Sequence, residues 1–229
     1  MKFTADQTRA IEHESGHLQL IACAGSGKTE VVARRIATLL KRGATPGNIV
    51  AFTFTEKAAG ELKERVHSRC QELLRDVQGL AEMFVGTIHA YCLDLLKSEV
   101  PEFMKYEVLN EVQQTLFVDR NSKGSGLTQA SDLKGKKLRR YVDTRNFTSA
   151  LSILREAKVR PEVFDDCSVA EHLETYSELL GRKRYFDYSS ILVEAVGVLM
   201  NDKGVRERLA ERIKYVIVDE YQDVNPVQE

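Results

Sequence analysis

The stretch Ala22-Cys-Ala-Gly-Ser-Gly-Lys-Thr29 decides the fold, because it joins an apolar run to the start of an amphipathic helix. The run Leu18 to Ala22 precedes it, and a helical pattern from Lys28 to Lys41 follows it. Small residues let successive backbone N–H groups turn inward around phosphate oxygens, and a helix start adds partial positive charge. The stretch therefore predicts a P-loop between a buried strand and a helix.

The P-loop residues are candidate ligands of a nucleotide and its metal ion. We expect contacts to the nucleotide from Ala24, Gly25, Ser26, Gly27, Lys28 and Thr29. Lys28 would reach the outer phosphates as a catalytic cation, and Thr29 would supply a hydroxyl to Mg²⁺. Ala22 replaces the first glycine of the general pattern, which is tolerable because alanine is small.

An acidic pair near the other end of the chain completes the predicted site. Tyr215-Val-Ile-Val-Asp-Glu220 places two carboxylates at the tip of an apolar run, where they are costly unless they serve a cation. Asp219 is predicted to hold Mg²⁺ through water, and Glu220 to orient and deprotonate an attacking water. A solvated acidic turn after a core strand is the alternative, and the P-loop upstream favours the catalytic interpretation.

Further apolar runs and helical stretches predict an α/β fold with a parallel sheet flanked by helices. The expected strands are residues 18–22, 48–54, 83–88 and 215–219, and the expected crossover helices are residues 56–78 and 89–98. The order resembles a RecA-like P-loop NTPase. From about Pro101 to Arg184 the pattern is helical with no convincing strand, so residues 1–100 with 185–229 are interpreted as an incomplete motor domain and residues 101–184 as a helical accessory insert.

Composition limits the class of protein. A chain of 229 residues with 43% hydrophobic content can bury a full core. With 33 basic and 34 acidic side chains, any nucleic-acid contact must come from a local patch. The four cysteines lack metal-ligand spacing, which favours reduced thiols. No run approaches the roughly 18 apolar residues of a membrane span, and the stretch MKFTADQTRAIEHE (1–14) lacks the basic start and apolar run of a secretion signal, so we expect a cytoplasmic protein.

Several motifs beside the P-loop resemble those of the UvrD/Rep/PcrA group of superfamily 1 DNA helicases. The matching runs are FTADQTRAI (3–11), AFTFTEKAAGELKERV (51–66), GTIHAYCLDLL (86–96), FDYSSILVEA (186–195) and DEYQDVNPVQ (219–228). The last is the most specific, because DExQD with a downstream glutamine is characteristic of this group. The resemblance covers the chain from end to end and implies ATP and Mg²⁺ as cofactors.

The resemblance also implies roles for residues outside the P-loop. Gln7 would recognise adenine, and the single-stranded DNA track would be lined by Phe54, Thr55, Lys57, Thr87 and His89. An aromatic side chain can stack on a base while hydroxyl and ammonium groups hold phosphates. The alternatives are a solvated Gln7, a core Phe54, a helix-cap charge at Lys57 and a structural His89.

Two local features remain open at the level of sequence. Many relatives have a basic residue after the P-loop threonine that packs against adenine, whereas this chain has Glu30, for which Arg34 or Arg35 could substitute. The run Leu133 to Tyr141 holds five basic residues and no acid. It is interpreted either as a phosphate-contacting patch or as a solvated helix face.

By resemblance, the function is an ATP-dependent 3′-to-5′ DNA helicase in repair, replication restart or recombination, acting on single-stranded DNA and single-strand/duplex junctions. The alternatives are the helicase part of a helicase–nuclease and a truncated, non-catalytic nucleotide- or DNA-binding module. The second motor domain of the family is not in this sequence, and a strand would be missing between the P-loop strand and the Asp219 strand. We therefore expect a fragment or truncated product, completed by further domains or a protein partner, that alone binds nucleotide weakly and hydrolyses it slowly.

Overall fold

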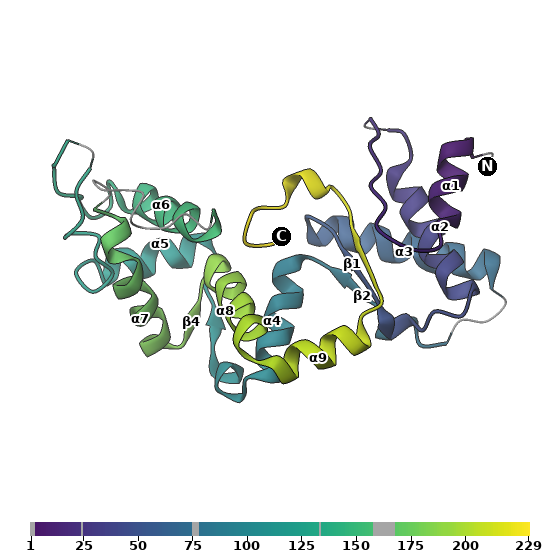
Figure 1. Ribbon diagram of the computed structural model, residues 1–229. Helices are drawn as coiled ribbons and strands as arrows, with labels where there is room; N and C mark the ends of the chain where they lie inside the picture. The colour runs from purple at the N-terminus through teal and green to yellow at the C-terminus, as the bar shows by residue number, and fades with distance from the viewer. Residues whose placement is uncertain (1–2, 24, 75–77, 133, 158–167) are drawn as a thin grey trace. The chain divides into compact units, whose positions relative to one another are not determined.

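The computed structural model describes residues 3–23, 25–74, 78–132, 134–157 and 168–229. They form two compact units (Figure 1): unit 1 is Met1–Tyr91 with Arg206–Asp223, and unit 2 is Cys92–Val205 with Val224–Glu229. These boundaries differ from the expected division after residues 100 and 184, because helices α4 (Ile88–Glu99) and α9 (Lys203–Arg212) belong partly to each unit. The division into a motor domain and an accessory insert stays a prediction.

Unit 1 contains a parallel three-stranded sheet in the order β2-β1-β5. The strands are β1 (Ile49–Phe52), β2 (Phe84–Gly86) and β5 (Tyr215–Val218), all within expected runs but shorter. In register, Phe52 pairs with Gly86 on one side and with Val218 on the other. The three strands therefore end at one edge of the sheet. The predicted α/β class with a parallel sheet flanked by helices is confirmed.

Alternation along β1 separates two packed faces. Ile49 and Ala51 are fully buried in the core formed with α2 (Lys28–Lys41) and α3 (Glu56–Leu73). Helix α2 lies where apolar periodicity predicted it, and α3 lies within the crossover helix expected at residues 56–78. On the opposite face, the Phe52 ring packs edge-on against Tyr91 at the start of α4, with ring centroids 5.5 Å apart. Helix α1 (Ala5–Glu12) packs against α2.

The strand expected at Leu18 to Ala22 is wrong. These residues have no regular secondary structure, and Ile21 is 91% exposed. The physical reason is that a strand needs a neighbour for its backbone N–H and C=O groups, and no described strand pairs with this segment. In the described sheet, β5 pairs with β1 along one edge, and no described strand pairs with its other edge. Apolar composition alone thus does not make this segment a strand.

Unit 2 is mainly helical, as expected, but it contains a small sheet. Its helices are α5 (Glu111–Arg120), α6 (Thr144–Glu156), α7 (Leu173–Lys183) and α8 (Tyr188–Asn201), with parts of α4 and α9. Strand β3 (Glu107–Val108) pairs in parallel with β4 (Tyr185–Phe186), so the expectation of no strand between residues 101 and 184 is wrong for β3. Two-residue strands are too short for periodicity to reveal them.

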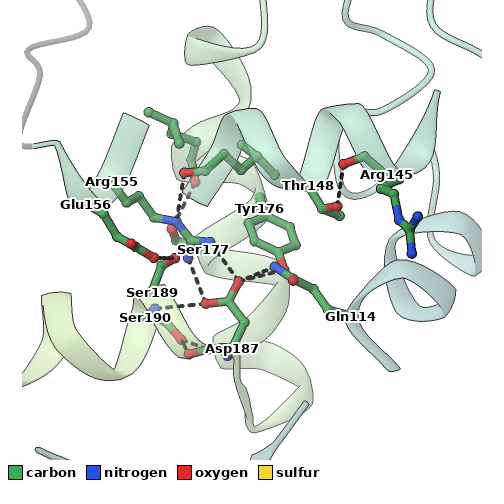
Figure 2. A network of polar contacts seen from close by, with 12 residues as sticks. Gln114, Arg145, Thr148, Arg155, Glu156, Tyr176, Ser177, Asp187, Ser189 and Ser190 are labelled. Carbon is green, nitrogen blue, oxygen red and sulfur yellow. Dashed lines mark hydrogen bonds and ion pairs between the residues drawn. The ribbon is translucent and has the colours of Figure 1, made fainter. Parts of the chain in front are cut away.

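A buried polar network centred on Asp187 joins the helices of unit 2 (Figure 2). Asp187 is the N-cap of α8, and its carboxylate accepts from the two terminal guanidinium nitrogens of Arg155 at 3.0 and 2.7 Å. The Tyr176 hydroxyl donates to Asp187 Oδ2 at 2.9 Å, and the Gln114 amide donates to both Asp187 and Tyr176. One carboxylate therefore fixes α5, α6 and α7 against the start of α8.

The charge environment of Asp187 favours its ionised form. Burial by itself raises the pKa of this carboxyl, but the positive charge and hydrogen bonds of Arg155, with those of Ser190 and Tyr176, bring the pKa below its usual range. The side chains of Asp187 and Arg155 are both almost fully buried. Removing one partner would leave an uncompensated charge in the core.

The basic run near residue 137 is not a helix face. Leu133 lies outside the described residues. The Oδ1 atom of Asp132 accepts from the backbone N–H groups of Lys134 and Lys136 at 2.9 Å each, a pattern of a turn rather than of a helix. Arg140 is paired with buried Asp119 at 3.0 Å. The helix-face alternative is therefore wrong, and phosphate contact stays a prediction.

In the parts of the chain that the structure describes, no helix is long and apolar enough to cross a membrane.

We predict that Tyr176→Phe lowers the free energy of unfolding by about 1–2 kcal/mol at pH 7, because Asp187 loses a donor and Gln114 loses an acceptor. Urea unfolding followed by circular dichroism measures the difference. Tyr185→Phe is the matched control in the same unit, because its hydroxyl lies outside this network. Equal losses in the two variants would contradict the prediction.

The same variant is expected to show a pH dependence. Because the folded-state pKa of Asp187 is lowered, its ionised form stabilises the fold above its unfolded-state pKa of about 3.9, and this contribution is lost as the pH falls through the folded-state pKa. Tyr176→Phe weakens the interactions that lower the pKa. The stability gap between the two chains should therefore narrow on acidification, measured by urea unfolding from pH 7 downward. A difference in unfolding free energy that grows on acidification would contradict this prediction.

Candidate functional site

The glycine-rich turn has the backbone conformation that phosphate binding requires. Gly25 and Gly27 have φ of +75° and +85°, in the left-handed region that favours glycine. Gly27 is the N-cap of α2, so the free N–H groups of that helix begin directly after the turn. Ser26 and the two glycines are therefore placed as predicted at a helix N-terminus, while Ala24 lies outside the described residues.

Gln7 lies against this turn from the first helix. Thr4 and Gln7 form a reciprocal capping box at the start of α1, in which Gln7 Oε1 accepts from the Thr4 N–H at 2.9 Å. The other end of the Gln7 amide donates to the Ser26 carbonyl at 3.0 Å. The alternative of a solvated Gln7 side chain is therefore wrong. Its contact with adenine stays a prediction.

Lys28 and the acidic pair come together from opposite ends of the sequence. The Lys28 ammonium donates to the Ala22 carbonyl at 3.2 Å and lies 3.9 Å from Glu220 Oε1. Asp219 directly follows β5, and its N–H donates to the Phe52 carbonyl at 2.9 Å. The structure thus unites the cation and the two carboxylates that the sequence assigned to one site. Thr29 is half-buried in the first turn of α2.

The acidic pair is electrostatically prepared for a cation. Burial, followed by the charge of Glu220, raises the pKa of Asp219, while nearby Lys28 opposes the shift. A divalent cation would relieve both unfavourable effects. The Thr29 hydroxyl and the Asp219 carboxylate are hard oxygen donors, the kind that Mg²⁺ prefers. The donor set therefore fits Mg²⁺ bound by few side chains, and no cluster of three metal-ligating side chains occurs among the described residues.

The backbone at Glu220 is strained, and a neighbour holds its side chain. Glu220 has φ of +54°, which is unusual for a residue other than glycine. The Gln222 amide donates to Glu220 Oε2 at 2.5 Å, leaving Oε1 toward Lys28. No role was predicted for Gln222, although its place two residues after the catalytic candidate in DEYQD was the signal for one. Strained backbone of this kind concentrates at functional sites.

Glu30 faces the core rather than the site. It is 7% exposed and accepts from Arg34 Nε at 3.1 Å and from Arg69 Nη2 at 3.3 Å, which links α2 to α3. Arg34 also lies 5.7 Å over the ring of Phe3, and Arg35 donates to the His13 carbonyl at 2.7 Å. The two arginines suggested as substitutes at the adenine are therefore already engaged in contacts within unit 1.

The residues assigned to the DNA track follow β1 and β2, at the same edge of the sheet as Asp219. Phe54 is 65% exposed, so the alternative of a core side chain is wrong. Thr55 is the N-cap of α3, accepting from the Ala58 N–H at 3.1 Å, and Lys57 is exposed in the first turn. Thr87 accepts from the Ala90 N–H at the start of α4. His89 lies in that same turn, and its role stays a prediction.

Comparison with known proteins agrees with this arrangement. Residues 3–229 match the model of the UvrD/REP helicase N-terminal domain. The chain is similar to the ATP-dependent DNA helicase UvrD1 of Mycobacterium tuberculosis (33% identical over 97% of this chain and 29% of the relative). It is also similar to the ATP-dependent DNA helicases PcrA of Staphylococcus aureus (30% identical; 97% and 30%) and Bacillus subtilis (28% identical; 97% and 29%).

The matched relatives are much longer proteins, of which this chain spans less than a third. The match nevertheless includes the glycine-rich turn, both polar strand ends and the acidic pair, because it runs over residues 3–229. The chain therefore belongs to the UvrD/REP helicase N-terminal domain family.

Proposed function

We propose that this chain is the ATP-binding part of an ATP-dependent DNA helicase that moves 3′ to 5′ on single-stranded DNA in repair or recombination. One observation carries the proposal: Lys28, at the start of α2, lies 3.9 Å from Glu220, which follows Asp219 at the end of β5. The groups proposed as phosphate-binding cation, metal ligand and catalytic base would thus lie close together. Helicases similar to this chain are named ATP-dependent.

The residues divide the work of hydrolysis among them. The turn at residues 25–27 and the start of α2 would bind phosphate oxygens through backbone N–H groups, and Lys28 would bind the outer phosphates. Thr29 and Asp219 would hold Mg²⁺, which neutralises charge on the phosphates. Glu220, oriented by Gln222, would position the attacking water and accept its proton.

The DNA would cross the same edge of the sheet. The exposed ring of Phe54 offers a surface on which a base can stack, and the exposed ammonium of Lys57 can approach a phosphate. Thr55 and Thr87 stand at the starts of two helices there, where their hydroxyls accept from the Ala58 and Ala90 N–H groups and the helix dipoles favour an anion. Single-stranded DNA and its junctions with duplex are therefore the proposed partners.

We also propose that the 229-residue chain alone binds nucleotide but hydrolyses it slowly. The segment before the glycine-rich turn has no strand partner among the described residues, so the turn is anchored by α2 and α1 rather than by the sheet. Catalytic groups must be held within a fraction of an ångström to be effective. Further domains or a protein partner would supply the missing support.

Replacing Lys28 by alanine should weaken binding of the Mg²⁺–ATP complex by about 10- to 100-fold, because a charge-assisted contact to phosphate is removed. Calorimetric titration of the purified chain measures the affinity, and a parallel assay of phosphate release with and without oligo-dT measures turnover. Lys41→Ala, an exposed lysine at the other end of the same helix, is the charge-matched control. Unchanged affinity in Lys28→Ala would refute the assignment of the site.

Replacing Phe54 by alanine should weaken binding of oligo-dT by about 5- to 100-fold, since base stacking on an aromatic contributes about 1–3 kcal/mol. Phe54→Leu keeps apolar bulk without the ring and should lose nearly as much. Met104→Ala, an exposed apolar side chain of unit 2, is the control. Fluorescence anisotropy measures all three, and equal binding by wild type and Phe54→Ala would exclude stacking at this position.

A further inference from the structure

The carboxylate of Glu56 lies where β1 and β2 end. Glu56 is the first residue of α3, and its Oε1 accepts the hydroxyl proton of Thr87 at 2.9 Å. The two residues come from neighbouring strand ends, because Phe52 and Gly86 are paired in register. This contact therefore bridges the starts of α3 and α4, the two helices that begin at the proposed DNA track.

The contact leaves Thr87 without a proton to offer to DNA. A threonine hydroxyl has one proton, and Thr87 donates it to Glu56 while its oxygen accepts from the Ala90 N–H at 3.2 Å. A phosphate oxygen is an acceptor only, so it can bind this hydroxyl only after Glu56 has left. The Glu56 carboxylate and a DNA phosphate would therefore compete for the hydroxyl proton of Thr87.

The charge of Glu56 acts in the same direction. Partial positive charge at the starts of α3 and α4 attracts anions, and the carboxylate of Glu56 already compensates part of this charge. A phosphate arriving at Thr87 would meet this carboxylate at close range. Two unit charges about 4 Å apart repel each other measurably even in water. Lys57, on the same turn, contributes the opposite charge.

We propose that Glu56 is a built-in competitor for the DNA phosphate at Thr87 and that it sets the affinity of this site for single-stranded DNA. In the DNA-free chain Glu56 occupies the Thr87 hydroxyl, and strand binding displaces it. The inference rests on the proposed function, in which the strand crosses Phe54, Thr55 and Thr87. It adds to that function a residue that weakens binding, a role that none of the proposed contacts has.

The test compares oligo-dT binding by the full chain with that of Glu56→Ala, by fluorescence anisotropy at several salt concentrations. Glu61→Ala is the matched control, because Glu61 is exposed on the same helix and its removal changes the net charge equally. We expect Glu56→Ala to bind roughly five- to tenfold more tightly at low salt. Glu61→Ala should stay within about twofold of wild type, since solvent screens its more distant charge.

Thr87→Val, alone and combined with Glu56→Ala, tests the competition itself. If Glu56 acts by holding the Thr87 hydroxyl, the gain from Glu56→Ala should be clearly smaller in the Thr87→Val background, where only the part due to charge repulsion remains. Glu56→Gln keeps an acceptor but loses the charge, and it should give an intermediate gain.

The outcomes separate this inference from the function beneath it. Equal binding by Glu56→Ala and Glu61→Ala, or a gain that persists fully without the Thr87 hydroxyl, would overturn the competitor role alone. If no chain binds oligo-dT even at the lowest salt, while Met104→Ala and wild type remain folded, the DNA track itself is overturned and the inference falls with it.

Discussion

The parallel pairing of β5 with β1 is the constraint on which the candidate site depends. The ladder runs from Ile49 opposite Tyr215 to Phe52 opposite Val218, and the Asp219 N–H continues it by donating to the Phe52 carbonyl. Parallel strands end at a common edge, so this register places the acidic turn beside the residues that follow β1. A shift of one residue would turn the alternating side chains of β5 to the opposite face of the sheet.

Charge balance is the second theme of this edge. Burial and then the charge of Glu220 raise the pKa of Asp219, and the charge of Lys28 opposes this shift. Glu56 adds a further carboxylate at the neighbouring strand ends. The protein's own side chains thus pair with one another at this edge: Lys28 lies near Glu220, and Thr87 donates to Glu56. Ligands would exchange these internal partners for phosphate and metal, which makes binding a replacement of contacts rather than the filling of a void.

Most of the fold could be predicted from local sequence, but the site's supporting contacts could not. Apolar periodicity predicted α2, a helix-forming stretch predicted α3, and the three strands of the sheet lie within the predicted runs. The segment at residues 18–22 did not become a strand, because strand formation depends on a neighbour that composition does not reveal. The site residues were predicted from motifs, and the structure brings Lys28 to Glu220 as expected.

What sequence reasoning missed depends on partners distant in the chain or on backbone geometry. The orientation of Glu30 follows from Arg69, 39 residues away, and no local pattern connects the two. The buried network joins side chains of three helices to Asp187, the N-cap of a fourth. The left-handed backbone at Glu220 has no sequence signal, since glutamate rarely adopts it. Contacts of this kind appear only when the chain is folded.

The exposed aliphatic segment before the glycine-rich turn bears on how the protein is made. Leu18, Leu20 and Ile21 emerge from the ribosome long before β5 is synthesised, so during translation they form a solvent-exposed apolar stretch. Such segments associate with one another when nascent chains are crowded, and chaperones that hold unfolded chains recognise this kind of sequence. Recombinant yield should therefore depend on expression temperature and chaperone supply more than on the stability of the helical unit.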